Sequence, residues 1–585
     1  MRELKPLYEV KEDLVHVAMG RQEADLLITD ISLVNVSSGE IQKNCMIAIR
    51  HGRIAYVGPE TSDGAAIRIA AKETRNGNGL FASPGFIDLH VHFESSQVPP
   101  SEYARAALSR GETTALPDCH EIGNVLGVDG VIWMRDNVLQ TPLKVIMGVP
   151  SCVPATPFET AGSEIGPEEV ERLFKEERFG ALAEMMNYPG VLGCMEGPTK
   201  KITSALKAGA VVEGHISGQG WRDLVGYFAA GVMTCHESLT TQDLIDRIRL
   251  GITTYCRAGS GWDEVAELAQ ALKVIPDHRN VCLVTDDRDP SDVLKKGTMD
   301  HVIRRAISEG IPIMKAYQMA TISPAAHLAR IRVPGYEWVL EIGRLSPGYR
   351  ADIALLSDLE TVAVEDTYVH GQLIRDIDFP APTVAGITDT VNIGREVQAE
   401  DFEIPGGDTH LISITEKLLT EHSRMPFTGN IAEYASQDII KLACLERHAG
   451  TGEKTVCLLK GLGIRSGAVA STVAHDSHQL LVAGVNDDDM ALAASLIKDA
   501  GGGIVAVRSG QVVSMIKLPG AGLIGDATLE EMASSSSQQK DAWKALGCEL
   551  EDPFMLFSLL GLTVLPHVRI TPKGIFSVDR FEYLQ

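Results

Sequence analysis

The sequence between about residues 80 and 340 repeats one pattern of apolar and polar positions. Short apolar runs of strand length alternate with stretches of helical periodicity, and each run ends in polar or reactive side chains. There are eight such runs, and they end near His90 and His92, Asp118 to Glu121, Ser151 and Cys152, Glu184, His215, His236 and Glu237, Arg257, and Asp286 and Asp287. Eight strand-then-helix units predict a (β/α)8 TIM barrel, whose strands carry functional side chains at their carboxyl ends.

An open, doubly wound sheet is the other arrangement that alternating strands and helices can form. That fold would be expected to carry a glycine-rich phosphate turn after its first strand. This chain has His90-Val91-His92 at that point. We therefore expect one barrel over residues 81–340.

Strand periodicity marks both flanks of this region. Before it, two short strands are joined by an x-Gly pair at residues 51–52, which is typical of a hairpin turn. After it, residues 350–356 have the pattern of a strand, and residues 369–374 that of a second turn between strands. Because both flanks are β and each is short, we expect residues 23–80 and 341–385 to form one small β-sandwich domain.

The two ends of the chain differ from these regions. Residues 1–22 are polar with helical spacing and predict an N-terminal helical arm. Residues 400–585 alternate strands and helices and predict a C-terminal α/β domain. Within this domain, the polar tract at residues 534–539 is expected to be a surface loop. The fold class predicted for the whole chain is therefore α/β.

Composition narrows the classes of function. The 585 residues carry a formal net charge of -25, which disfavours binding to nucleic acids but is compatible with a small neutral or cationic substrate. No segment reaches the roughly 18 apolar residues that span a bilayer, so no membrane association is expected. None of the ten cysteines forms a Cys-x-x-Cys pair, which favours reduced, buried thiols. We expect a cytoplasmic protein.

The strand ends hold side chains suited to binding divalent metals. Residues two apart on a strand face the same side, so His90 and His92 can chelate one ion together. Four further candidates end the fourth, fifth, sixth and eighth runs, namely Glu184, His215, His236 and Asp286. Six ligands exceed what one tetrahedral ion needs, so we expect two ions with Glu184 bridging them. Asp286 is placed to bind one ion and to accept a proton from water, and these ligand types suit Mn, Fe or Zn.

Each of these side chains has a structural interpretation when taken alone. A single His-x-His pair on a strand is more often structural than a ligand, and an Asp-Asp pair is commonly a helix N-cap. The order along the chain favours the metal site. His-x-His, Glu, His, His and Asp fall at the ends of strands one, four, five, six and eight.

This order resembles the amidohydrolase superfamily, and several segments resemble the adenine deaminase family more narrowly. Those segments are PGFIDLHVHFESS at 84–96, DCHEIGNV at 118–125, PSCVPATPF at 150–158, EMMN at 184–187, TDDR at 285–288, QMAT at 318–321 and STVAHDSH at 471–478. The resemblance covers nearly the whole chain. Dihydroorotase-like relatives typically bridge their metals with a carboxylated lysine, whereas the fourth run here offers Glu184 and no lysine.

The resemblance implies a reaction and its requirements. The reaction is hydrolytic deamination of adenine to hypoxanthine and ammonia, in purine salvage or catabolism, by a metal-activated hydroxide at a binuclear site. It implies two divalent ions, with Mn2+ favoured over Fe2+ or Zn2+. Asp286 would pass a proton to the departing amine, and Glu184 would act as the bridging ligand. Large barrel enzymes often assemble, so a homo-oligomer such as a dimer is expected.

Polar side chains after three of the runs are candidates for holding the purine ring, namely Ser95, Ser96, Asp118, His120, Glu121 and Asp287. Strand-to-helix turns with N-capping are the structural alternative for this group. The segment His475-Asp476-Ser477-His478 could form a second metal site or cap the barrel mouth, and a structural or domain-interface role is favoured. A Ser, His and Asp within one short segment do not by themselves make a hydrolase triad.

Two other functions stay open from the sequence. The chain departs from residues that the adenine deaminase family commonly carries at Gln97, Cys119, Cys235 and 216–221. These departures motivate an alternative hypothesis, in which the protein is a related amidohydrolase that acts on another aminopurine, a pterin or a cyclic amide. A non-catalytic purine-binding protein is the alternative from another class, and the intact set of ligands argues against it.

Overall fold

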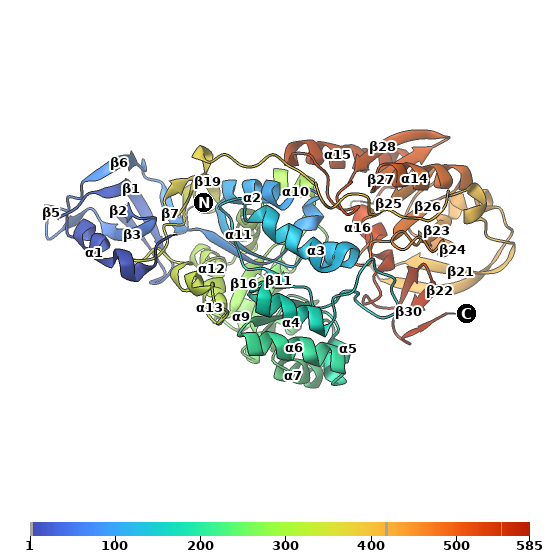
Figure 1. Ribbon diagram of the computed structural model, residues 1–585, viewed down its shortest axis with the longest axis horizontal. Helices are drawn as coiled ribbons and strands as arrows, with labels where there is room; N and C mark the ends of the chain where they lie inside the picture. Colours follow the sequence, from blue (N-terminus) through green and yellow to red (C-terminus); the bar gives the residue numbers. More distant parts are fainter. Residues whose placement is uncertain (1–3, 416–418, 551–552, 585) are drawn as a thin grey trace.

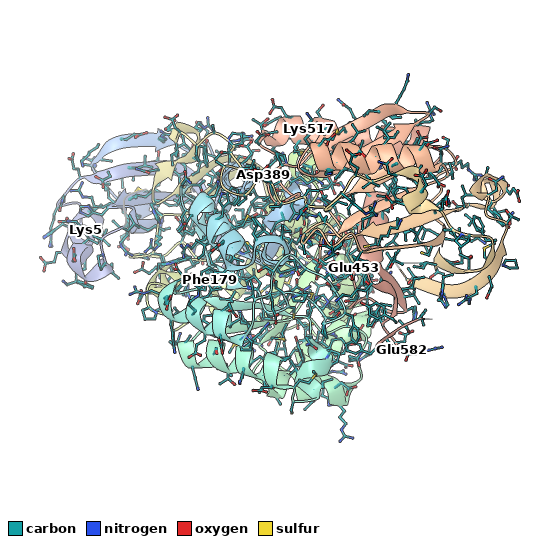
Figure 2. The ribbon with its side chains drawn as sticks, turned by 45° about the vertical axis from the view of Figure 1, so that its right-hand side comes forward. Lys5, Phe179, Asp389, Glu453, Lys517 and Glu582 are labelled. Carbon is teal, nitrogen blue, oxygen red and sulfur yellow. The ribbon has the colours of Figure 1, made fainter. Side chains whose placement is uncertain are left out.

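The computed structural model describes residues 4–415, 419–550 and 553–584, which form three parts in a row (Figure 1). A small β domain lies at one end, an α/β barrel in the middle and a C-terminal domain at the other end. Figure 2 shows the same order from a second direction, with Lys5 on the small domain, Phe179 on the barrel and Lys517 on the C-terminal domain. The barrel thus has a neighbouring domain on each of two sides.

Parallel strands form the barrel, and the third and eighth strand positions are each split into two short segments. In chain order the strands are β8 (Phe86–His92), β9 (Glu112–Pro117), β10 (Lys144–Val145) with β11 (Gly148–Val149), β12 (Ala181–Met185), β13 (Val211–Gly214), β14 (Thr234–Cys235), β15 (Thr253–Arg257), and β16 (Val281–Val284) with β17 (Asp286–Asp287). β17 pairs in parallel with β8, which joins the last strand to the first. The barrel predicted from the eight apolar runs is confirmed.

Helices follow the strands and cover the outside of the barrel. The longer ones are α2 (Pro100–Ser109), α3 (His120–Val138), α4 (Pro167–Glu176), α6 (Glu196–Ala208), α7 (Trp221–Ala229), α8 (Thr241–Arg249), α9 (Val265–Val274) and α11 (Met299–Ser308). Shorter helices are α5 (Tyr188–Leu192), α10 (Pro290–Lys295), α12 (Ile313–Met319) and α13 (Ile322–Leu328). Each long helix buries an apolar face, which in α4 includes Val170 and Leu173. Because all the barrel strands run in the same direction, the side chains that follow them gather at one rim of the barrel.

The small domain combines residues from both flanks of the barrel in one mixed sheet. Its strands are β1 (Ala24–Asn35), β2 (Glu40–Arg50), β3 (Arg53–Pro59), β6 (Ala71–Asn76), β7 (Phe81–Pro84), β18 (Ile353–Asp358), β19 (Ala363–Val369) and β20 (Gln372–Leu373). β7 pairs with β18, which joins the two pieces. His51 and Gly52 both have positive φ, as the turn of a tight hairpin requires. The arrangement of this domain as a β-sandwich stays a prediction.

Two short elements complete the small domain. The pair β4 (Thr61–Ser62) and β5 (Ala65–Ala66) forms a separate hairpin. The N-terminal residues form α1 (Leu7–Ala18), which buries Val10, Leu14 and Val17 against apolar side chains of β1, β2 and β3. The helix is therefore anchored on the small domain by its apolar face, while its other face is polar.

The C-terminal domain is built on an eight-stranded sheet. Along that sheet the strands are β22 (Thr420–Phe427), β21 (Gly407–Ile414), β24 (Lys454–Lys460), β23 (Ile439–Leu445), β26 (Leu480–Gly484), β25 (Ala468–Ser471), β27 (Gly503–Arg508) and β28 (Gln511–Lys517). The helices α14 (Asp487–Asp499), α15 (Leu529–Ala545) and α16 (Pro553–Ser558) belong to this domain. A small sheet of β29 (Val568–Thr571), β30 (Gly574–Ser577) and β31 (Glu582–Tyr583) ends it.

The polar tract at residues 534–539 lies inside helix α15, so the surface loop predicted there is wrong. The hydroxyl of Thr528 accepts a hydrogen bond from the backbone amide of Glu531, and the Glu531 carboxylate accepts one from the amide of Thr528. This reciprocal cap starts the helix. Ser536 and Gln539 are buried. Capping and tertiary packing outweigh the weak helix propensity of a serine-rich tract.

Two expectations from composition can be compared with the structure. All ten cysteines are free thiols, and all except Cys194 are buried, as predicted. Within the described ranges, no helix combines the length and the apolar character needed to cross a membrane.

A loop that follows β11 docks the C-terminal domain on the barrel. Thr156 Oγ1 lies 2.7 Å from Thr563 Oγ1, and the ring of Phe158 stacks on Phe576 with centroids 4.6 Å apart. The carboxylate of Glu159 accepts hydrogen bonds from the backbone amide of Thr563 at 3.1 Å and from its hydroxyl at 2.5 Å. The segment PSCVPATPF and the residue that follows it therefore hold two domains together.

Glu159→Gln is expected to stabilise the protein at alkaline pH. Burial, and then the nearby Asp476 carboxylate, raises the pKa of Glu159 to about 8 from an ordinary value of 4.5. Because the fold favours the neutral acid, this contribution to stability is complete below pH 4.5 and is lost as the pH rises through about 8. The variant should melt at nearly the same temperature as the wild type at acidic pH, and about 2–5 °C higher at alkaline pH.

Calorimetry at a series of pH values on both sides of neutrality measures this difference. Glu360→Gln, at an exposed position of the small domain, is the matched control and should show no gain that grows with pH. A constant offset between Glu159→Gln and wild type across the whole series would contradict the raised pKa.

Candidate metal and substrate site

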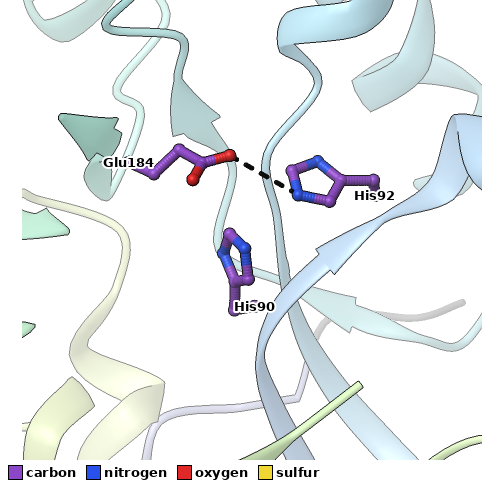
Figure 3. Close-up of side chains that lie close together, drawn as sticks. All are labelled: His90, His92 and Glu184. Carbon is purple, nitrogen blue, oxygen red and sulfur yellow. Dashed lines mark ion pairs between the residues drawn. The ribbon is translucent and has the colours of Figure 1, made fainter. Parts of the chain in front are cut away.

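The predicted metal ligands converge at the carboxyl rim of the barrel. His90 and His92 lie on β8 with ring centroids 4.8 Å apart, and Glu184 of β12 lies opposite them (Figure 3). Two groups of possible ligand atoms, each within 4.8 Å of one another, share Glu184. One group adds His90 and His92, and the other adds His215 and His236. The fold thus gathers side chains that are far apart in the sequence around one carboxylate.

The two oxygens of Glu184 face different histidines. Oε1 lies 3.5 Å from His92 Nε2, whereas Oε2 lies 2.6 Å from His215 Nδ1 and 3.1 Å from His236 Nε2. Burial alone would raise the pKa of Glu184, but His215 and His236 hold it well below its usual range. An ionised carboxylate with one oxygen on each side is what a bridging ligand requires.

Two of the histidines have ring nitrogens that suit metal binding. Burial, and then the adjacent His90 ring, lowers the pKa of His236 to about 4, so this imidazole is neutral near pH 7. His90 Nε2 is buried and makes no hydrogen bond within the part of the chain that the structure describes. A buried ring nitrogen without a partner is unfavourable, and an unprotonated one can bind a metal. The donor set of imidazoles and carboxylates therefore fits divalent ions.

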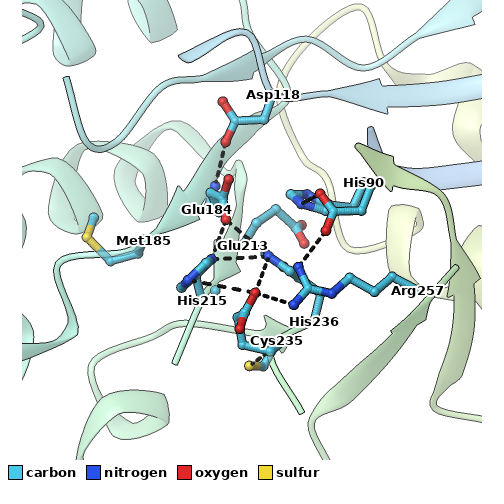
Figure 4. A network of polar contacts seen from close by, with 12 residues as sticks. His90, Asp118, Glu184, Met185, Glu213, His215, Cys235, His236 and Arg257 are labelled. Atoms are coloured by element: carbon cyan, nitrogen blue, oxygen red, sulfur yellow. Dashed lines mark hydrogen bonds and ion pairs between the residues drawn. The ribbon is translucent and has the colours of Figure 1, made fainter. Parts of the chain in front are cut away.

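Asp286 is held between histidines and an arginine. Its Oδ1 lies 3.5 Å from His90 Nε2 and 3.3 Å from His92 Nε2, and its Oδ2 accepts a 2.5 Å hydrogen bond from Arg257 Nη1. Figure 4 shows Arg257 reaching this cluster, and its Nη2 also lies 2.5 Å from Glu237 Oε1. Burial would raise the pKa of Asp286, but Arg257 and the histidines hold it well below its usual range. Arg257 therefore orients two carboxylates at the site.

Half of the predicted substrate-contacting residues line a common cavity. His120, Glu121 and Asp287 do so directly. Ser95 lies beside them, and its hydroxyl is 2.5 Å from Asp287 Oδ1 and 3.3 Å from Glu121 Oε1. Ser95, Glu121 and Asp287 thus form a hydrogen-bonded edge that can present donors and acceptors to a small molecule, and His120 lines the same cavity.

Asp118 and Ser96 do not line that cavity. Asp118 Oδ2 accepts a hydrogen bond of 3.2 Å from the backbone amide of Glu184, and the Asp118 carbonyl lies 3.0 Å from His92 Nδ1. The Ser96 hydroxyl donates to the carbonyl of Phe93 at 2.5 Å. In this geometry Asp118 supports two proposed metal ligands from behind, and Ser96 supports the local turn.

A cavity of about 340 Å³ opens over these side chains. Its polar wall carries the histidines and carboxylates of the barrel rim. Its apolar wall combines Trp262 of the barrel with Met555, Leu559 and Leu562 of the C-terminal domain. A cavity of this size with one polar and one apolar wall suits a small planar ligand.

Sequence reasoning assigned no role to several residues of this cavity. Arg257 and Glu237 each end an apolar run, so their positions were a usable signal. Trp262 and Leu559 had no such signal, because they reach the cavity only through the path of loops and the docking of a second domain.

The positions that depart from the family pattern lie around this cavity. The Cys235 thiol is 3.3 Å from the carbonyl of Ile216 and so supports the segment after His215. Gln219, in that same segment, lines the cavity. Gln97 and Cys119 are buried and do not line it. The changed segment at 216–221 is therefore the departure with the most direct access to a bound molecule.

The fold and the site together define a class of protein. A barrel with buried histidines and carboxylates at its carboxyl rim is the arrangement of metal-dependent amidohydrolases, and residues 81–374 match the model of the amidohydrolase family. The adenine deaminase of Moorella thermoacetica is 39% identical over 597 residues, which cover 99% of this chain and 98% of that protein. The chain belongs to the adenine deaminase family.

A second family model and a second relative agree with this assignment. Residues 414–582 match the model described as the adenine deaminase C-terminal domain. The adenine deaminase of Clostridium botulinum strain Loch Maree is 37% identical over 600 residues, which cover 99% of this chain and 98% of that protein. Among solved structures, N-acetyl-D-glucosamine-6-phosphate deacetylase from Mycobacterium smegmatis aligns at 18% identity with a TM-score of 0.44, over 60% of this chain and 99% of that one.

Proposed function

We propose that this protein hydrolyses adenine to hypoxanthine and ammonia at a site that holds two divalent metal ions. The observation that carries the proposal is the placement of Glu184, whose Oε1 faces His92 and whose Oε2 faces His215 and His236 in a buried cavity. The full-length relatives named adenine deaminase support the choice of substrate.

The ions would be held by six side chains, namely His90, His92, Glu184, His215, His236 and Asp286. Imidazole and carboxylate ligands without thiolate suit Mn2+, with Fe2+ and Zn2+ as the other candidates. When bound, such ions lower the pKa of water towards ~7 and so supply a nucleophile at neutral pH.

The protein's own groups account for the proton movements. Asp286 is the group placed to accept a proton from water, because it is ionised and lies beside His90 and His92. The same carboxyl then protonates the departing amine. Arg257 keeps Asp286 oriented through this cycle, since their hydrogen bond fixes Oδ2 and leaves Oδ1 directed at the histidines.

The reaction balances with water as the only co-reactant. A C–O bond forms at C6 of adenine and the C6–N bond breaks; one proton of the water leaves with the amine as ammonia, and the other ends on a ring nitrogen of hypoxanthine. The apolar wall with Trp262 and Leu559 is suited to the face of the purine ring, and the polar edge with Glu121 and Asp287 to its nitrogens.

Metal loading is expected to control activity directly. Protein treated with a chelator should lose ammonia release from adenine, and about two equivalents of Mn2+ per chain should restore it. Metal analysis together with an ammonia assay measures both quantities, and guanine and pterins serve as comparison substrates. Two bound ions without ammonia release from adenine would contradict the proposal and favour another aminopurine, pterin or cyclic amide as substrate. A metal-free protein that binds purine without turnover would favour a binding function.

A further inference from the structure

A short loop of the C-terminal domain reaches into the mouth of the barrel. Its residues His475 and Asp476 line the cavity together with His120 and Glu121. Both are almost fully buried, with 6% and 3% of their surfaces exposed. The C-terminal domain thus adds polar groups to a site whose proposed metal ligands all come from the barrel.

Among the residues that the structure describes, only one oxygen of the Asp476 carboxylate lies within ion-pair distance of a neighbour. Oδ1 lies 3.6 Å from His120 Nε2, whereas Oδ2 is buried and has no hydrogen-bond partner among the residues described. His120 Nδ1 lies 3.5 Å from Glu184 Oε1, so one imidazole ring separates Asp476 from the proposed bridging ligand. A buried carboxylate oxygen without a donor is unfavourable, and a donor from a bound molecule would remove that cost.

The neighbouring His478 does not turn this loop into another metal site. Its Nδ1 accepts a 3.1 Å hydrogen bond from the backbone amide of Ala474, which places the proton of the neutral ring on Nε2. That protonated nitrogen lies 3.8 Å from Glu121 Oε2. Nε2 makes no hydrogen bond among the residues described, and because a protonated nitrogen cannot bind a metal, the loop is better suited to hydrogen bonding.

Adenine offers few N–H groups to such an acceptor. Its exocyclic amine is bonded to C6, the carbon that reacts, so it belongs beside the metal ligands. The free base carries one other N–H, on its five-membered ring. A purine substituted at N9, as in a nucleoside, has no N–H on that ring.

We propose that Asp476 accepts the N–H of the five-membered ring and thereby selects the free base over purines substituted at N9. This proposal rests on the proposed function for the class of ligand. It gives the C-terminal domain a role in specificity, since the acceptor comes from that domain while the proposed metal ligands come from the barrel. An ionised carboxylate can only accept hydrogen bonds, so it stabilises a bound ring that carries an N–H group. It makes no hydrogen bond to an alkylated nitrogen.

The test compares two ligands that are not turned over. Dissociation constants of hypoxanthine and 9-methylhypoxanthine are measured by equilibrium dialysis on the manganese-loaded full chain. Asp476→Asn preserves the volume of the side chain and removes its charge, so a purely steric preference would survive in it. Ser477→Ala is the matched control, because Ser477 lies on the same loop, is buried and does not line the cavity.

Wild-type protein and Ser477→Ala should bind hypoxanthine at least about tenfold more tightly than its methylated form. Asp476→Asn should weaken binding of the free base by about ten- to a hundredfold and leave binding of the methylated base nearly unchanged, so the preference for the free base is lost. Equal weakening of both ligands, or an unchanged preference, would overturn the proposal and leave Asp476 a structural role. Absence of ammonia release from adenine by the wild type would overturn the proposed function, whereas the dialysis ratio would still decide the role of Asp476.

Discussion

Glu184→Gln is expected to lower kcat/KM for adenine by about a thousandfold or more and to leave fewer than two metal equivalents per chain. The carboxylate carries negative charge on two oxygens, of which Oε1 faces His92 and Oε2 faces His215 and His236. Glutamine has nearly the same volume, but its amide nitrogen cannot bind a cation. One of the two histidine pairs would therefore lose its shared ligand, while packing around β12 would be preserved.

Metal analysis of the purified variant measures this effect, and circular dichroism checks that the fold is retained. Glu121→Gln is the matched control for metal content, since Glu121 is also a buried carboxylate of the cavity but lies outside the proposed ligand set. It should keep two equivalents even where adenine binding is altered. Full metal content in Glu184→Gln would refute its bridging role.

Asp286→Asn is expected to lower kcat for adenine by about 10²- to 10⁴-fold, because an amide cannot take a proton from water and return it to the amine. The carboxylate is held ionised by Arg257, and its other oxygen faces His90 and His92. Substitution also leaves the buried Arg257 with one carboxylate fewer, so metal content is measured in parallel.

A substrate with a better leaving group separates the two roles of Asp286. Chloride departs from 6-chloropurine without being protonated, so the loss in Asp286→Asn should be smaller for 6-chloropurine than for adenine. Asp277→Asn, on an exposed turn before β16, is the control and should keep the wild-type kcat. Equal losses on both substrates would mean that Asp286 does not protonate the amine and acts in metal binding or in accepting the proton from water.

The barrel could be predicted from local patterns. Its parallel strands are buried on both faces, so each is a short continuous apolar run, and the polar residue that ends it marks the carboxyl rim. The hairpin at His51 and Gly52 was predictable for a similar reason, since the turn itself demands positive φ. The tract at 534–539 was predicted wrongly because its composition favours a loop. An N-terminal cap and a buried face stabilise it as part of a helix.

The sequence by itself determined which residue types occupy the strand ends and in what order, from His90 to Asp286. The alternation of side chains along a strand and the position of polar residues at the carboxyl ends of barrel strands are local features. They can therefore be predicted without knowing how the elements pack. Only the tertiary structure decided that one oxygen of Glu184 faces His92 while the other faces His215 and His236, and that Arg257 orients Asp286. It also decided that Asp476 enters the cavity from another domain. These contacts join residues far apart in the chain, and their distances depend on how strands, loops and whole domains pack together.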